Sequence, residues 1–167
     1  LLAGLARRRR LLSQESALKY FLLGAYASAF FLFGAAFLYG YAGTISLVGI
    51  SAAAGSANDV FLLIGIVFIS VGLLFKISAV PFHSWTPDVY QGAPTPITAF
   101  MAACTKVAAF GAILRIFYVG FAESQTIWRP IIITIAIITM LFGSIVAIAQ
   151  RDVKRMLAYS SIAHAGF

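Results

Sequence analysis

Four long apolar runs constrain this chain more than any other feature of its sequence. They cover residues 17–42, 60–82, 94–118 and 130–149. A helix needs about 20 apolar residues to cross the hydrocarbon core of a bilayer, and each run supplies that length. The chain is 62% hydrophobic and 10% charged, and the runs show neither the polar face of a soluble helix nor the alternation of barrel strands. The sequence therefore predicts an all-α fold, a polytopic transmembrane helix bundle.

The runs also predict that residues 1–167 form a single membrane domain with one broken helix. Pro81 interrupts the second run, and a short helix is expected to follow as far as residue 90. Proline lacks an amide donor and clashes with the preceding turn, so the helix opens there. Another span begins at residue 156 and reaches only about half the required length. The first six residues are apolar but too few to cross a membrane. We therefore expect a fragment of a longer protein.

The basic residues favour a membrane protein over a nucleic-acid-binding one, although the formal net charge is +7. Eight of the twelve Lys and Arg residues lie in two groups, within residues 7–19 and 151–155. Both groups adjoin apolar runs, and no aromatic or polar groove residues are interleaved with them. The positive-inside rule places these basic loops in the cytoplasm, together with Gln91, while Ser51 and Ser124 face the other side.

Two lone lysines stand inside apolar runs, where a charge is costly. Placing Lys at the centre of a membrane helix costs about 2.5–3.5 kcal/mol on insertion scales, so such residues usually line an ion or proton route. Lys106 lies about 18 Å from either end of its run, too far for its stem to reach water. Lys76 lies near the break at Pro81, so it either transfers protons or extends its stem to cytoplasmic water. The pattern predicts proton transfer by both lysines.

The break itself offers two further candidate residues. His83 follows the opening, where freed backbone groups and water are expected, and imidazole titrates near neutral pH. His83 is therefore a candidate proton relay, although a histidine that caps the broken helix fits the sequence equally well. Pro81 is predicted to open the helix, expose carbonyls near Lys76 and hydrate that lysine.

The sequence contains no motif for a cofactor or a metal. It has no glycine-rich dinucleotide loop, no P-loop and a single cysteine, Cys104. We therefore expect no nucleotide, flavin, iron–sulfur or metal site within this chain.

One longer stretch carries a family resemblance. Residues 75–96 read FKISAVPFHSWTPDVYQGAPTP, which resembles the signature of the antiporter-like membrane subunits of respiratory complex I. Three other segments support it at compatible spacing: ESALKYF from Glu15, TKV from Thr105, and KRMLAYSSIAHAGF from Lys154. The resemblance therefore extends from about Glu15 to the last residue.

The resemblance implies a fold of two inverted five-helix units, of which this chain holds most of one. It matches Lys76 to the lysine of the broken seventh helix and Lys106 to the lysine of the eighth. It matches Lys19 to a lysine at the start of the sixth helix, near the half-channel. The family's glutamate of the fifth helix and the lysine of the second unit match no position in this sequence.

The function that the resemblance implies is that of a subunit of a proton-translocating NADH:quinone oxidoreductase in the bacterial inner membrane. NADH, FMN, iron–sulfur clusters and quinone are then expected in other subunits, with those membrane subunits, the lipid bilayer and protons as partners. Two alternatives stay open. One is a subunit of a multisubunit cation/proton antiporter, which shares the signature region. The other is an inert membrane scaffold, in which Lys76 and Lys106 form ion pairs.

Overall fold

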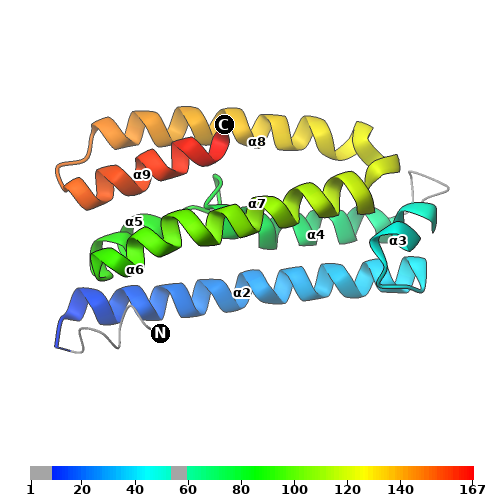
Figure 1. Ribbon diagram of the computed structural model, residues 1–167, viewed down its shortest axis with the longest axis horizontal. Coiled ribbons are helices and arrows are strands. Elements are labelled where there is room, and N and C mark those ends of the chain that lie inside the picture. Colours follow the sequence, from blue (N-terminus) through cyan, green and yellow to red (C-terminus); the bar gives the residue numbers. More distant parts are fainter. Residues whose placement is uncertain (1–8, 54–59) are drawn as a thin grey trace.

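The computed structural model describes residues 9–53 and 60–167, which form a bundle of helices (Figure 1). Arg7 and Arg8 of the first basic group lie outside the described residues. In chain order the elements are α2 (Leu11–Ala42), α3 (Leu47–Ala53), α4 (Val60–Ile77), α5 (Trp85–Gly92), α6 (Thr95–Phe100), η1 (Met101–Thr105), α7 (Lys106–Arg115), η2 (Ile116–Gly120), η3 (Ala122–Ser124), α8 (Gln125–Ile148) and α9 (Val153–Gly166). η1 and η2 are π-helical turns, and η3 is a 3₁₀ turn.

Within residues 9–53 and 60–167, four segments are long and apolar enough to cross a membrane, which confirms the predicted class of fold. They are Leu11–Ala42, Val60–Ile77, Thr95–Gly120 and Ala122–Ile148. Their ends differ from the predicted ends because polar residues extend the first and last of them. The last span begins well before Pro130, which lies inside α8, since a membrane helix tolerates a proline.

α4 is the central helix of the bundle. Half of its most apolar window is buried, against 17% for α2, 17% for Thr95–Gly120 and 11% for Ala122–Ile148. α2 packs along α4, and α8 packs along α9 (Figure 1). The outer faces of α2, α7 and α8 therefore remain apolar and uncovered, as expected of helices that face lipid or other membrane subunits.

The broken helix is present, but the break begins before Pro81. α4 ends at Ile77, and Ser78 adopts a left-handed conformation with φ of 65°. The chain then runs irregularly until α5 begins at Trp85. Ser78 already turns the backbone out of the helix, so Pro81 lies within the opening and does not start it.

Side chains from α5 and α8 satisfy the backbone groups that the break frees. The indole Nε1 of Trp85 donates to the carbonyl of Phe75 at 3.1 Å. The amide of Val80 donates to the Thr139 hydroxyl on α8 at 3.0 Å. Buried backbone groups without partners would each cost free energy, so these contacts stabilise the opening inside the bundle.

The predicted grouping of basic residues is seen at one end of the bundle. Figure 1 shows the start of α2, the end of α5 and the α8–α9 connection together there, with α3 and the start of α8 at the opposite end. The Gln91 amide donates to Asp152 at 3.3 Å across this end. That this end faces the cytoplasm stays a prediction.

Cysteine labelling measures this orientation. We expect Gln125→Cys, in a Cys104→Ser background, to react with a membrane-impermeant thiol reagent added to intact cells. Arg151→Cys is expected to react only after permeabilisation, because the basic end faces inward. Both positions are exposed, as is Cys104. Labelling of position 151 from outside would reverse the predicted orientation.

Gly92 permits the closest approach between α5 and α2. A Cβ atom there would lie 1.7 Å from Ser16 Oγ and 2.3 Å from the carbonyl oxygen of Leu12. We expect Gly92→Ala to destabilise the protein by about 1–3 kcal/mol, because a backbone oxygen cannot move aside without shifting α2. The thermal unfolding midpoint of the full-length protein in detergent measures this loss.

Gly111 supplies the matched control for this substitution. No described atom lies within 4 Å of a Cβ atom at that position, and alanine favours the helical conformation over glycine. Gly111→Ala should therefore leave the midpoint unchanged or raise it. Equal midpoints for the two variants would contradict the close packing of α5 on α2.

Candidate functional site

Lys106 lies inside the bundle, at the junction of the π-helical turn η1 and α7. Its side chain is buried, with 8% exposure. The ammonium Nζ donates to the carbonyl oxygen of Ser161 at 2.6 Å and to its hydroxyl at 2.7 Å. Ser161 belongs to α9, so a cation at the start of α7 is held by neutral oxygens of α9. π-helical turns are common at functional positions in helices.

Lys76 lies on a different face of the bundle and has a more open environment. Its side chain is exposed in the groove that α2 forms with α4 and the segment Thr95–Gly120. We call this the Lys76 groove; it consists of two adjoining hollows of about 510 and 560 Å³. Among residues 9–53 and 60–167, Lys76 has no hydrogen-bonding or ionic partner, and the structure does not bring it into contact with Lys106.

His83 packs against α8 and α9. Its ring centroid lies 4.8 Å from that of Phe142 and 6.5 Å from that of Tyr159. Its Nδ1 atom is buried and has no hydrogen-bond partner within the described part of the chain. Ser84 is the N-cap residue of α5, and the His83 ring lies close to the backbone of Pro81 within the break. The relay and the capping interpretations of His83 both stay predictions.

Lys19 belongs to an ion cluster at the basic end of the bundle. Its Nζ lies 2.6 Å from Asp88 Oδ2 and 2.6 Å from Glu15 Oε1. The guanidinium of Arg155 contacts the other carboxylate oxygen of Asp88 at 2.7 Å. Burial by itself raises the pKa of Asp88, but hydrogen bonds from Lys19 and Arg155 outweigh this and hold the pKa below its ordinary value.

This cluster joins three helices that are distant in sequence: α2, α5 and α9. The Ser13 hydroxyl donates to the carbonyl of Gly92 at 2.7 Å, and the Ser16 hydroxyl donates to that of Asp88 at 2.9 Å. On the other side, Lys154 Nζ donates to the carbonyl of Ala93 at 3.2 Å. Sequence reasoning did not identify Asp88 as the shared partner of two cations. The available signal was its position as the only carboxylate within residues 75–96.

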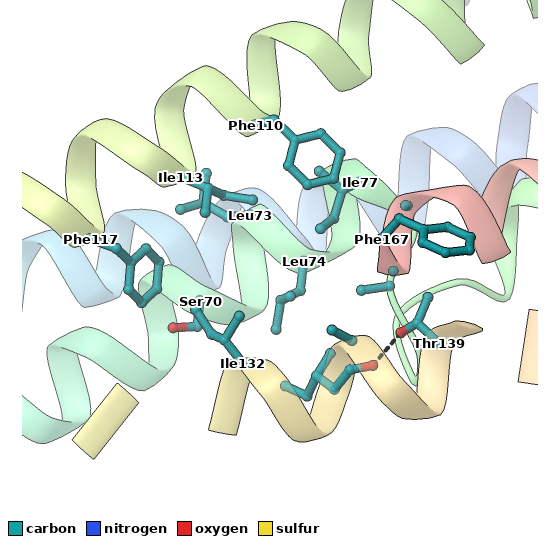
Figure 2. Close-up of a pocket in the computed structure, with 15 residues that line it drawn as sticks. Ser70, Leu73, Leu74, Ile77, Phe110, Ile113, Phe117, Ile132, Thr139 and Phe167 are labelled. Carbon is teal, nitrogen blue, oxygen red and sulfur yellow. Dashed lines mark hydrogen bonds between the residues drawn. The ribbon is translucent and has the colours of Figure 1, made fainter. Parts of the chain in front are cut away.

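A separate cavity of about 180 Å³ lies between α4, α7, α8 and α9 (Figure 2). Leu74, Ile113, Phe117 and Phe167 surround it, and Thr139 points its hydroxyl to the carbonyl of Ile135 at 2.6 Å. Among the described residues, none of the side chains that line this cavity is titratable. Lys76 of α4 and Lys106 of α7 are not among the residues that line it.

Comparison with known proteins places these features in a family. The family model described as "NADH:quinone oxidoreductase/Mrp antiporter, TM" matches residues 1–167. The chain is 69% identical to NADH-quinone oxidoreductase subunit N of Rhodococcus opacus, covering 100% of this chain and 31% of the relative. It is 62% identical to subunit N of Mycobacterium tuberculosis, covering 100% of this chain and 32% of that protein. The chain thus spans about a third of the curated relatives it matches.

Solved structures agree with this assignment. A chain of respiratory complex I from Thermus thermophilus matches with a TM-score of 0.82 and 44% identity, over 99% of this chain and 35% of that chain. A chain of the Mrp complex from a Dietzia species matches with a TM-score of 0.85 over 93% of this chain and 29% of that chain. At 24% identity, the second match shows a shared fold only.

The wording of the signature narrows the resemblance further. TPDVYQGAPTP, residues 86–96, resembles chain N of bacterial complex I more than chains L or M, and the relatives named subunit N confirm this prediction. The helical bundle, the broken helix and the full-length family match agree with one another. This chain belongs to the family of transmembrane subunits shared by NADH:quinone oxidoreductases and Mrp antiporters.

Proposed function

We propose that this chain is part of a membrane subunit of a proton-translocating NADH:quinone oxidoreductase, in which Lys106 and Lys76 conduct protons through a half-channel. The observation that carries the proposal is Lys106, which is buried within a membrane helix and bonded only to the oxygens of Ser161. No carboxylate neutralises it among the described residues. A lysine with neutral partners can release its proton and take up another, whereas a tight ion pair holds the charged form.

Lys76 has an environment suited to an earlier step of the same transfer. It lies in an open groove and lacks a protein partner among the described residues, so water in the groove can hydrate it. A charge that arrives from a carboxylate elsewhere in the protein, or from a neighbouring subunit, would change the proton affinity of Lys76. The proton would then move by water and side chains towards Lys106. Electrons would pass through other subunits, which would hold NADH, FMN, iron–sulfur clusters and quinone.

A cation/proton antiporter is the second candidate function. The fold similarity to a chain of the Mrp complex favours it, because the family includes both kinds of assembly. The scaffold alternative requires inert ion pairs at Lys76 and Lys106, and neither lysine contacts a carboxylate in the described part of the chain. Identity to the subunit N relatives favours the oxidoreductase over the antiporter.

Proteoliposomes that contain the complete complex distinguish these functions. We expect NADH oxidation to drive proton uptake in sodium-free medium, and Lys76→Met to reduce the proton-to-electron ratio severalfold in the assembled complex. Lys154→Met is the matched control, because that lysine makes one hydrogen bond to a neutral carbonyl at the end of the bundle. Proton movement that requires sodium and ignores NADH would favour the antiporter.

A further inference from the structure

The hydrogen bonds of Lys106 leave its site incomplete. An ammonium group has three N–H donors, and two of them are used on the carbonyl and hydroxyl oxygens of Ser161. The Ser161 hydroxyl accepts one of these bonds and keeps its own proton to donate. The site therefore has one ammonium donor and one hydroxyl donor available.

Tyr90 brings a second hydroxyl to the same place. This residue is on α5 and is 3% exposed. Its hydroxyl approaches that of Ser161 without reaching full hydrogen-bond geometry, and no other described residue offers it a partner. A buried hydroxyl without a full hydrogen bond costs about 1–3 kcal/mol, so its position favours a further partner beyond the described residues.

The surrounding packing holds these groups together. The Tyr90 ring belongs to an apolar cluster with Trp85 and Ala158, against which Met101 and Ala102 pack. Those last two residues are part of η1, the π-helical turn that leads directly into Lys106. α5, η1 and α9 therefore converge at one buried point, where the Lys106 ammonium and the hydroxyls of Ser161 and Tyr90 lie among mainly apolar side chains, with Tyr20 of α2 packed beside them.

We propose that one water molecule bridges Lys106, Ser161 and Tyr90, and that it is the first acceptor of the Lys106 proton. The water would accept from the third N–H of Lys106 and would make further hydrogen bonds to the two hydroxyls. Three partners are typical of a buried water. In the transfer step an N–H bond of the ammonium breaks, its electron pair stays on nitrogen, and the proton bonds to the water oxygen. Ser161 and Tyr90 are positioning residues for this water.

This inference rests on the proposed function and makes it more specific. Ser161 fixes the ammonium from α9, and Tyr90 fixes the water from α5, the second part of the broken helix. A movement of α5 would therefore change the distance between the water and Lys106. The two hydroxyls bind the same water, so their contributions to proton translocation are not additive. Removing either one should cause most of the loss that removing both would cause.

The test uses the complete complex in proteoliposomes, with three variants of this site. Tyr90→Phe and Ser161→Ala should each reduce proton translocation about tenfold at parental assembly. The double variant should be no worse than either single variant by more than about twofold. Ser161→Thr keeps a hydroxyl, so its proton translocation should be close to that of the parental complex and well above that of Ser161→Ala. Tyr118→Phe and Ser70→Ala are matched controls, since Tyr118 is exposed and Ser70 donates only to its own helix.

The bridging water gives a measurement that a structural role would not change. In the parental complex we expect cryo-EM density for a water within hydrogen-bond distance of all three groups, and its loss in Tyr90→Phe. A density map of the parental complex without this water overturns the inference. This measurement does not depend on the variants, so it still applies if the Tyr90→Phe complex does not assemble. Parental translocation in both single variants also overturns it. If both single variants translocate protons at the parental rate while Lys106→Met does not, only this inference fails. If Lys106→Met also translocates protons at the parental rate, the proposed function fails too.

Discussion

Lys106→Met in the full-length protein is expected to abolish proton translocation, or to reduce it by about 10²-fold, while the complex still assembles. Methionine matches the length and apolar stem of lysine but cannot carry a proton. Lys106 is 8% exposed and bonds only to Ser161, so no other described side chain can take over its role at that position. The measurement is the ratio of protons translocated to NADH oxidised.

One further variant at this site separates the effect of charge from that of proton exchange, and one variant elsewhere is the control. Lys106→Arg should also impair translocation, because a guanidinium keeps its proton at all accessible pH values. Lys154→Met should leave the ratio unchanged, since Lys154 is at the basic end of the bundle and donates to a backbone carbonyl. A parental ratio in assembled Lys106→Met would remove Lys106 from the proton route.

Asp88→Asn is expected to cause a large loss of assembled complex, larger than that of any other single substitution in the ion cluster. The carboxylate accepts charge-assisted hydrogen bonds from Lys19 and Arg155 at 2.6 and 2.7 Å. Losing them should cost about 1–3 kcal/mol, reduced by partial exposure to solvent. α5 would then lose its shared partner on α2 and α9. The amount of intact complex in detergent and its thermal inactivation midpoint measure the effect.

Glu15→Gln is the matched control for Asp88. Glu15 also pairs with Lys19 at 2.6 Å, but its side chain is 54% exposed, so its ion pair contributes little. We expect its midpoint to stay within about a degree of the parental value. An equal loss in Glu15→Gln and Asp88→Asn would show that the number of ion pairs matters and not their position between helices.

The sequence by itself determined the class of fold, the presence of a broken helix and the depth of Lys106. These follow from local physics. A run of apolar residues must form a helix in lipid because its backbone groups have no other partner. A lysine far from both ends of such a run cannot reach water. The conclusions needed only the order of residues along one segment, so no contact between segments had to be known.

Only the tertiary structure decided which groups meet. Ser78, which no sequence rule marks, ends α4, because Trp85 and Thr139 supply partners for the freed backbone groups. Asp88 joins two cations from segments far away in sequence. Lys76 and Lys106 lie on different faces of the bundle. The sequence could not show this, because the surroundings of a helix side chain depend on which helices pack around it. Partners across helices depend on how α2, α5 and α9 pack, which no single segment encodes.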